Sequence, residues 1–260
     1  MSETASPAEP VLTERRGHVL LISLNRPDAM NAVNLDLANA LAAALDMLDA
    51  DDDLRVGVLT GNGRGFSAGM DLKAFVAGGM PNVPGRGFAG ITERAARKPL
   101  IAAIEGFALA GGLEIALSCD LLVAGEGAKL GIPEVTVGLF AGAGAVFRLA
   151  NHLPQAIAME LALTGAPMPA ERAAQLGIVN RVAPKGEAVT VALELAEQIA
   201  KNAPLGVMAS KQIIKDSVGL TDAEGWALQQ PLIDSVFSSS DATEGATAFA
   251  EKRPPAWTGR

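Results

Sequence analysis

The sequence is poor in the residues that form disulfides and metal sites. Its 260 residues include one cysteine, two histidines and no tyrosine. A single thiol cannot form a disulfide within the chain, and no C-x-x-C or H-x-x-H spacing is present, so we expect no metal site. Cys119 lies in an apolar run, which favours a small buried hydrophobe over a reactive thiol. His18 and His152 have no serine or cysteine nucleophile paired with them.

Positive charge and long apolar runs are also scarce. The 21 Lys and Arg residues are outnumbered by 29 Asp and Glu, giving a net charge of −8. This balance argues against a nucleic acid or an anionic membrane as partner. No window approaches the roughly 18 apolar residues of a membrane span, and the acidic N-terminus lacks a signal-peptide core. We therefore expect a cytoplasmic protein with no membrane and no nucleic-acid partner.

The order of apolar segments predicts an α/β core followed by helices. With 49% apolar residues the chain can bury a substantial core, whereas residues 1–10 are expected to form a disordered leader. Asn34 can cap a helix whose apolar residues recur every three or four positions. We expect strands at 19–24, 56–60, 100–104, 121–124 and 177–182, and helices at 34–48, 111–118, 186–215 and 222–236. Residues 76–90, with repeated Gly and Pro, are expected to form a surface loop.

Two glutamates in apolar surroundings are the most informative feature of the chain. Glu114 lies between Leu113 and Ile115, and Glu134 follows Pro133. Burying a carboxylate is costly unless its charge is used or compensated, and two such groups together suit acid–base chemistry. The pair Gly111-Gly112 can open a helix whose free N–H groups hold a developing negative charge. The combination indicates a site that forms and protonates an oxyanion.

Other polar residues have simpler interpretations. Asp71 and Asp120 each end an apolar segment, a position that favours structural capping over catalysis. Glu114 alone could be a first-turn acid favoured by the helix dipole. Gly142-Ala-Gly144 lacks a dinucleotide fingerprint and is expected to open a helix that carries Arg148.

Four segments together resemble the crotonase (enoyl-CoA hydratase/isomerase) superfamily over roughly residues 11–260. The segment 25–31 (NRPDAMN) resembles the family's early turn beside coenzyme A, and 66–72 (FSAGMDL) its first oxyanion loop. The segment 106–120 resembles the part with the second oxyanion amide and first catalytic Glu. The segment 131–144 resembles the part with the second catalytic Glu. Ala110 departs from the pattern, because many hydratases have a third Gly there, and Ala145-Val146-Phe147 is more apolar than usual.

The resemblance implies both a fold and a set of site residues. It implies an α/β crotonase-like spiral of repeated ββα units at 11–199 and a C-terminal α-helical oligomerisation region at 200–260. It implies that Glu114 and Glu134 are catalytic, and that Ala68 and Gly111 donate the two N–H groups of the oxyanion hole. The positions implied to bind substrate are Ala29, Met30, Ser67, Asp71, Leu72, Phe88 and Gly142. No metal and no separate cofactor are expected, since coenzyme A is part of the substrate.

The function that the resemblance implies is enoyl-CoA hydration, the addition of water to a 2-enoyl thioester. Both acids favour hydration over isomerisation, which needs only one. Phe88 to Glu93 and the ending from Phe249 to Arg260 resemble the carnitinyl-CoA dehydratase branch, although the scarcity of aromatics favours an ordinary apolar acyl chain. A non-catalytic acyl-CoA-binding crotonase is a further alternative. An RNA-binding crotonase is nearly excluded, since residues 27–54 contain seven Asp and no Lys or Arg. The expected assembly is a homotrimer or a dimer of trimers.

Overall fold

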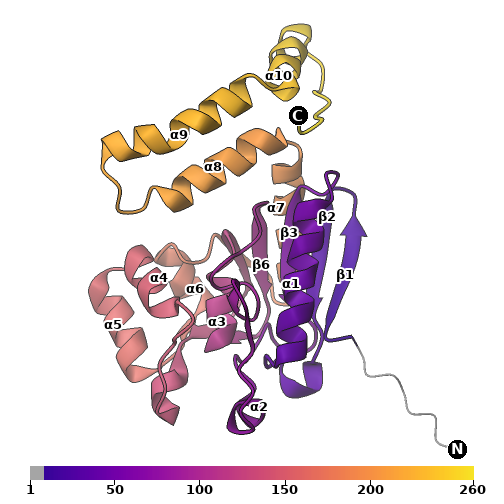
Figure 1. Cartoon of the computed structure of the whole chain (residues 1–260). Coiled ribbons are helices and arrows are strands. Elements are labelled where there is room, and N and C mark those ends of the chain that lie inside the picture. Colours follow the sequence, from indigo (N-terminus) through magenta and orange to yellow (C-terminus); the bar gives the residue numbers. More distant parts are fainter. Residues whose placement is uncertain (1–8) are drawn as a thin grey trace, which may run out of the picture.

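A six-stranded sheet forms the centre of the computed structural model, which describes residues 9–260 (Figure 1). Its strand order is β1-β2-β3-β6-β8-β11. The strands are β1 (Val11–Arg16), β2 (Val19–Leu24), β3 (Val56–Gly61), β6 (Leu100–Ile104), β8 (Leu121–Gly125) and β11 (Arg181–Ala183). Only β1 runs antiparallel to its neighbour; the other pairs are parallel.

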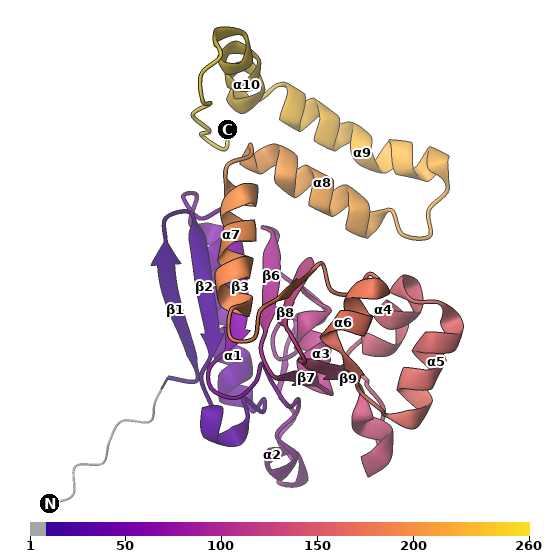
Figure 2. The same ribbon diagram turned by 180° about the vertical axis from the view of Figure 1, so that it is seen from behind.

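Helices cover both faces of this sheet. α1 (Leu35–Ala50) packs on one face and α7 (Ala188–Ala200) on the other (Figures 1 and 2). Coverage on both sides explains why strands such as β3 and β6 are almost continuously apolar. As expected, Asn34 caps α1, and its side chain accepts a hydrogen bond from Leu37 N at 3.0 Å. Leu37, Leu41 and Leu45 are fully buried.

A second, smaller sheet gives the core its repeated pattern. It contains β7 (Phe107–Leu109), β9 (Lys129–Gly131) and β10 (Met168–Pro169), in the order β10-β9-β7. The chain passes from β6 to β7 and then into α3 (Gly111–Ala116), and from β8 to β9 and then into the 3-10 helix η2 (Pro133–Val137). The expected α/β spiral of ββα units with a helical extension is confirmed.

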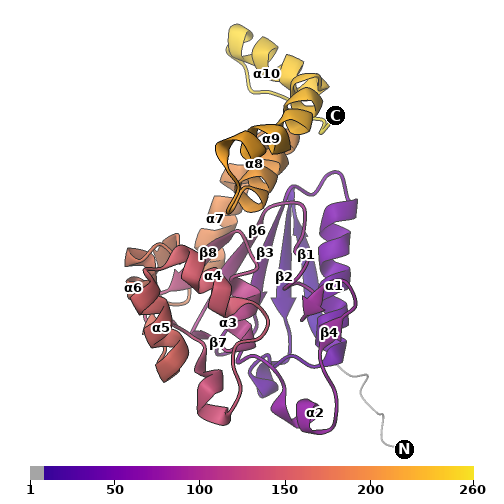
Figure 3. The ribbon, with the colours of Figure 1, turned by 60° about the vertical axis from the view of Figure 1, so that its left-hand side comes forward.

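The other helices form two groups, seen most clearly in Figure 3. α4 (Ala145–His152), α5 (Gln155–Thr164) and α6 (Ala170–Gln175) lie beside the sheet. α8 (Pro204–Asp216), α9 (Asp222–Phe237) and α10 (Ser240–Glu251) stand beyond one end of the core. Within residues 9–260 no helix is long and apolar enough to cross a membrane.

Three expectations about local structure need correction. The helix expected over 186–215 is two helices, because Pro204 has no N–H to donate and begins α8. The region 76–90 is not simply a surface loop. After α2 (Leu72–Val76) it forms the hairpin β4 (Asn82–Val83) and β5 (Gly87–Phe88), and its Phe88 is only 8% exposed. The strand expected at 177–182 is only β11 (Arg181–Ala183), because the chain from Leu176 to Asn180 forms the turn after α6, where Gly177 has φ +84°. The sequence analysis also did not predict β1, whose residues are mostly exposed.

The expected leader lies mostly outside the described part of the chain. Residues 1–8 are outside it, so this expectation is tested only at its last two positions. There the chain is ordered, because the Asn25 side chain donates to the Glu9 carbonyl at 2.9 Å and Asn25 N donates to Pro10 O at 2.8 Å. The described core therefore begins at Glu9.

The start of α3 has an unusual backbone. Ala110 precedes the helix with φ 52° and ψ −132°, a backbone conformation that residues other than glycine rarely adopt. This is the position at which many family members have glycine, so the departure noted in the sequence places a strained alanine next to Gly111. Such a residue costs on the order of 1–3 kcal/mol and persists only where the surroundings enforce it.

We expect Ala110→Gly to leave the free energy of unfolding unchanged or to raise it by up to about 1 kcal/mol, because glycine relieves the strain. The matched control is Ala192→Gly in the middle of α7, which should cost at least about 1 kcal/mol through helix propensity. Urea denaturation at one protein concentration measures both variants. Equal losses in the two would contradict the strain at Ala110.

Candidate active site

A cavity of about 580 Å³ brings the two glutamates together with both glycine-containing loops. It is lined by seven of the expected site residues, namely Ala68, Leu72, Phe88, Gly111, Glu114, Glu134 and Gly142. They come from five separate stretches of the chain, which only the tertiary structure places side by side.

Four expected substrate-binding residues, Ala29, Met30, Ser67 and Asp71, are absent from the cavity wall. Ser67 is fully buried, and its hydroxyl donates to the Asn31 carbonyl at 2.9 Å. Asp71 caps α2 by accepting from Lys73 N and Ala74 N, and it pairs with Arg26 at 3.1 Å. These two residues stabilise the first oxyanion loop without lining the cavity. The capping interpretation of Asp71 is confirmed.

Glu114 lies on α3, is 3% exposed and is held by the start of another helix. Its Oε1 accepts from Ala143 N at 2.7 Å and from Ala145 N at 3.2 Å, at the N-terminus of α4. Burial raises the pKa of Glu114, while these two hydrogen bonds and the Arg148 cation oppose the rise. No described residue donates to Oε2, so that oxygen is available to a molecule in the cavity. The sequence predicted that Gly142 to Gly144 opens a helix, but it did not predict that this helix start holds Glu114.

Glu134 is the less compensated of the two acids. It lies in η2, and its buried Oε2 has no hydrogen-bond partner among the described residues. Burial raises the pKa of Glu134 to about 7, and the nearby Glu114 carboxylate adds to the rise. At neutral pH Glu134 therefore holds a proton for much of the time, and the two acids titrate as a coupled pair.

The backbone amides beside the glutamates require one correction. Gly111 N donates to no group among the described residues and lies at the start of α3, as expected. Ala68 N, in contrast, donates to the Met30 carbonyl at 3.0 Å and is not a free donor. The assignment of Ala68 to the oxyanion hole is therefore wrong in this structure.

Met70 supplies the free amide that was assigned to Ala68. Val33 N donates to Gly69 O, and Asp71 N donates to Val33 O, so Val33 pairs with the residues on either side of Met70. In this parallel bridge the Met70 N–H points away from Val33. It donates to no group in residues 9–260, and Met70 lines the cavity. The FSAGMD segment shows a loop rich in small residues, but only the pairing with Val33 shows which amide is free.

The two loops that carry these amides approach each other closely at Gly69 and Gly111. A Cβ atom on Gly69, whose φ is +95°, would lie 2.7 Å from Gly111 N. A Cβ on Gly111 would lie 2.6 Å from the Phe88 ring. Side chains at either position would force the loops apart, so glycine is required for the two amides to face the same space.

The rest of the cavity wall is largely apolar, and the sequence identified few of these residues. Four of the chain's eight phenylalanines line it: Phe75, Phe88, Phe140 and Phe147. Glu93 also lines it and adds a carboxylate at the wall. Because these residues come from α2, the β4–β5 region, the segment after η2 and α4, no local pattern could have grouped them.

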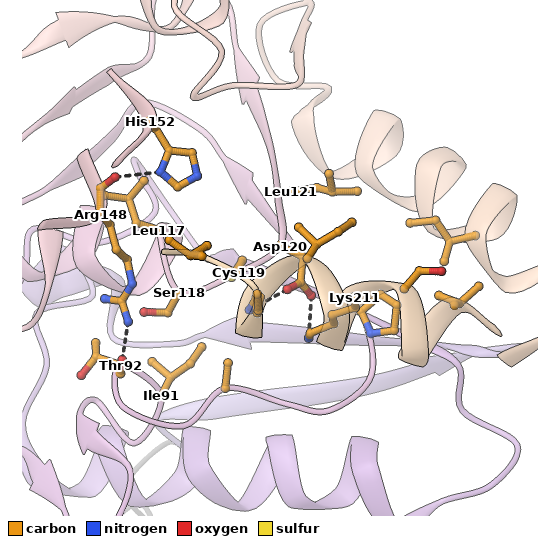
Figure 4. A pocket seen from close by; sticks show the side chains of 18 of the residues that line it. Ile91, Thr92, Leu117, Ser118, Cys119, Asp120, Leu121, Arg148, His152 and Lys211 are labelled. Atoms are coloured by element: carbon orange, nitrogen blue, oxygen red, sulfur yellow. Dashed lines mark hydrogen bonds and ion pairs between the residues drawn. The ribbon is translucent and has the colours of Figure 1, made fainter. Parts of the chain in front are cut away.

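A second cavity, of about 1010 Å³, is drawn in Figure 4. Thr92 and Glu93 line both cavities. The second cavity is bounded by α8, whose Lys211 and Lys215 each pair with Asp120 at 2.7 Å. Asp120 also accepts from Leu100 N at 2.8 Å, which gives it the structural role that the sequence favoured.

Known proteins of similar sequence and structure identify the family. The chain matches the enoyl-CoA hydratase/isomerase family over residues 14–260. It is 41% identical to the enoyl-CoA hydratase EchA19 of Mycobacterium tuberculosis, over 99% of each chain. It is 42% identical to a carnitinyl-CoA dehydratase of Salmonella typhi, over 97% of this chain and 100% of that protein. Its structure is similar to that of the enoyl-CoA hydratase EchA1 from Mycobacterium marinum, with a TM-score of 0.95, 54% identity, and coverage of 97% and 100%. These similarities and the cavity geometry lead to one conclusion: the chain is an enzyme of the enoyl-CoA hydratase/isomerase family and has the crotonase fold.

Proposed function

We propose that the protein catalyses the reversible syn addition of water to a trans-2-enoyl-CoA thioester. The observation that carries this proposal is the pairing in one cavity of a clamped Glu114 with an unpartnered Glu134, beside two free amides. Hydration needs one group to take a proton from water and another to give a proton to the substrate. Two acids held in different environments meet that need.

The amides of Met70 and Gly111 are proposed to hold the thioester oxygen. When water adds to Cβ, the electron pair of the double bond moves toward the carbonyl and negative charge develops on its oxygen. Two preorganised N–H donors stabilise that charge, and losing one typically costs about 3–4 kcal/mol. Gly111 lies at the N-terminus of α3, where the helix dipole adds to the effect.

The two glutamates are proposed to divide the proton transfers. Glu114, whose carboxylate is supported by two amides and the Arg148 cation, is the base that takes a proton from water. Glu134, with its pKa raised to about 7, is the acid that protonates Cα of the enolate. After one turnover Glu114 carries the proton and Glu134 is ionised, which is the state that the reverse dehydration requires.

The aromatic lining supports a second candidate substrate. A trimethylammonium group is stabilised over aromatic faces and beside carboxylates, and the cavity has four phenylalanines and Glu93. Crotonobetainyl-CoA hydration, the reaction of a carnitinyl-CoA dehydratase, therefore belongs in the assay. We propose that the segment 76–90, which supplies Met80, Asn82 and Phe88 to the wall, selects among acyl groups.

The first assay measures hydration of crotonyl-CoA, of longer and branched enoyl-CoAs, and of crotonobetainyl-CoA. Activity on any of them supports the proposal, and the ranking of kcat/KM identifies the acyl group. Double-bond migration without hydration would identify an isomerase instead. Binding of the thioesters without turnover of any would identify a non-catalytic acyl-CoA-binding protein.

We expect Glu114→Gln and Glu134→Gln each to lower kcat for hydration by at least about a hundredfold, because each removes a proton-transfer group. The protein should stay folded by circular dichroism. Glu126→Gln, at an exposed turn outside the cavity, is the matched control and should keep native activity. A glutamine variant with near-native turnover would exclude that residue from the mechanism.

The pH dependence follows from the coupled acids. Both directions of the reaction need a singly protonated pair, so kcat/KM should fall as pH rises through about 7, where Glu134 loses its proton. It should also fall at low pH, where Glu114 becomes protonated. Because hydration releases no proton, the two directions should show the same profile. A flat profile between about pH 6 and pH 9 would contradict these roles.

We also propose that the chain assembles as a homotrimer or a dimer of trimers through α8–α10. These helices stand beyond one end of the core (Figures 1 and 3). The helices and the turn between α8 and α9 expose large apolar side chains: Ile214, Val218, Trp226, Phe237 and Phe249. An exposed apolar surface of this kind is typical of an interface.

Light scattering at micromolar concentration should give three or six times the protomer mass of 26.6 kDa. Phe237→Asp should lower the mass, because it places a charge on the 77%-exposed ring position, whereas Ser235→Asp on the same helix is the control. A monomer mass for the native chain would contradict this assembly.

A further inference from the structure

Arg148 joins two residues that line the active-site cavity, Ala143 and Thr92, but does not itself line that cavity. It lies on α4 and lines the second cavity (Figure 4). One terminal nitrogen donates to the Ala143 carbonyl at 3.1 Å, and the other donates to the Thr92 carbonyl, as the dashed line in Figure 4 shows. The oxyanion hole does not use this side chain, and in the acid–base chemistry it acts only through its charge, which supports the Glu114 carboxylate.

The two carbonyls belong to two separate segments of the chain that both line the active-site cavity. Ala143 is also the residue whose N–H donates to Glu114 Oε1 at 2.7 Å, so Arg148 holds the carbonyl of a residue that holds the catalytic carboxylate. Thr92 follows the hairpin that ends in Phe88, whose ring lies against Gly111. One planar guanidinium therefore connects Ala143, which holds Glu114, with Thr92, which follows the hairpin beside Gly111.

We infer that Arg148 is a positioning residue that, through the Ala143–Ala145 turn, determines which oxygen of Glu114 faces the substrate. The inference rests on the proposed hydration. Its physical basis is the fork of the guanidinium, which can donate to two carbonyls in a fixed geometry, whereas a lysine ammonium is a point charge on a flexible stem. Displacing a catalytic group by about 1 Å is enough to slow a reaction about a hundredfold.

Arg148 also influences the charge of Glu114. Its cation opposes the rise in the pKa of Glu114 that burial causes. Asp120 is already paired with both lysines of α8, and Glu93 is exposed. The charged or titratable groups around Arg148 and the two cavity walls are Glu93, Glu114, Cys119, Asp120, Glu134, His152, Lys211 and Lys215. His152 follows on the same helix, and its Nδ1 lies 2.7 Å from the Arg148 carbonyl.

The first test is the pair Arg148→Met and Arg148→Lys, assayed as the full chain on the best enoyl-CoA. Arg148→Met should lower kcat about 10- to 100-fold and change KM less than about threefold, because the base is misplaced but substrate binding is kept. It should also move the acid limb of the kcat/KM profile to higher pH, since Glu114 loses a neighbouring cation. Arg148→Lys should restore the acid limb and recover kcat only in part, because the charge returns without the fork.

Arg55→Met is the matched control for a merely structural loss. Arg55 likewise donates to two carbonyls, those of Ala200 at 2.8 Å and Trp257 at 3.3 Å, but it lines neither cavity. It should lower thermal stability and leave the pH profile and KM unchanged. If Arg148→Met and Arg55→Met behave alike, with stability lost and kcat and pH profile intact, the positioning role is overturned.

A measurement without substrate separates this inference from the proposed function. Infrared difference spectra across a pH titration record the carboxyl band of Glu114, which Glu114→Gln identifies. The band should titrate at higher pH in Arg148→Met than in the native protein, and at close to native pH in Arg148→Lys. A native chain inactive on every enoyl-CoA would refute the proposed hydration, while this spectral shift would still test the link from Arg148 to Glu114. An unchanged titration would overturn the effect of the Arg148 charge on the pKa of Glu114. If Arg148→Met fails to fold, kcat of Arg148→Lys tests the positioning role, and a native kcat in that variant would overturn it.

Discussion

The donation of the Ala143 and Ala145 amides to one oxygen of Glu114 is the interaction on which the rest of the site depends. Glu114 is almost fully buried, and a buried carboxylate without partners would be costly. The start of α4 supplies those partners and joins α3 to the segment that follows η2. This one contact compensates the charge, fixes the orientation of the side chain and holds together two segments that line the cavity.

The same contact makes two chemically identical residues different. Glu114 receives two hydrogen bonds and lies near a cation, whereas Glu134 Oε2 is buried without a partner. Environments that push two carboxyl groups toward different protonation states are how one site provides both an acid and a base. The asymmetry lies in the neighbours of the two glutamates and not in the glutamates themselves.

Close backbone approach is the second constraint on the site. Gly69 and Gly111 meet with no room for a Cβ, and Ala110 next to them adopts a conformation suited to glycine. The strain at Ala110 therefore lies directly before Gly111, whose N–H must point into the cavity. Local strain held in place by surrounding structure is typical of active sites.

Most strands of the central sheet and the two glutamates of the site were predictable from sequence alone, because they depend on patterns of neighbouring residues. Apolar runs placed β2, β3, β6 and β8 within a residue or so, Asn34 marked the start of α1, and glutamates 114 and 134 stood out because they interrupt apolar sequence. Four specific motifs then indicated the family. Where a local rule was overlooked, as at Pro204, the error was a boundary and not a change of fold.

Tertiary structure alone decided which groups face the cavity and what each can do. Ala68 and Met70 are two residues apart, and only the pairing of Val33 with the chain around Met70 shows that the Met70 amide is free and the Ala68 amide is not. The phenylalanines of the wall, the amides that hold Glu114 and the two carbonyls that Arg148 joins come from distant segments. Sequence patterns report periodicity along one element, whereas hydrogen-bond partners and burial depend on contacts between elements, and those contacts set the free amides and the two pKa values.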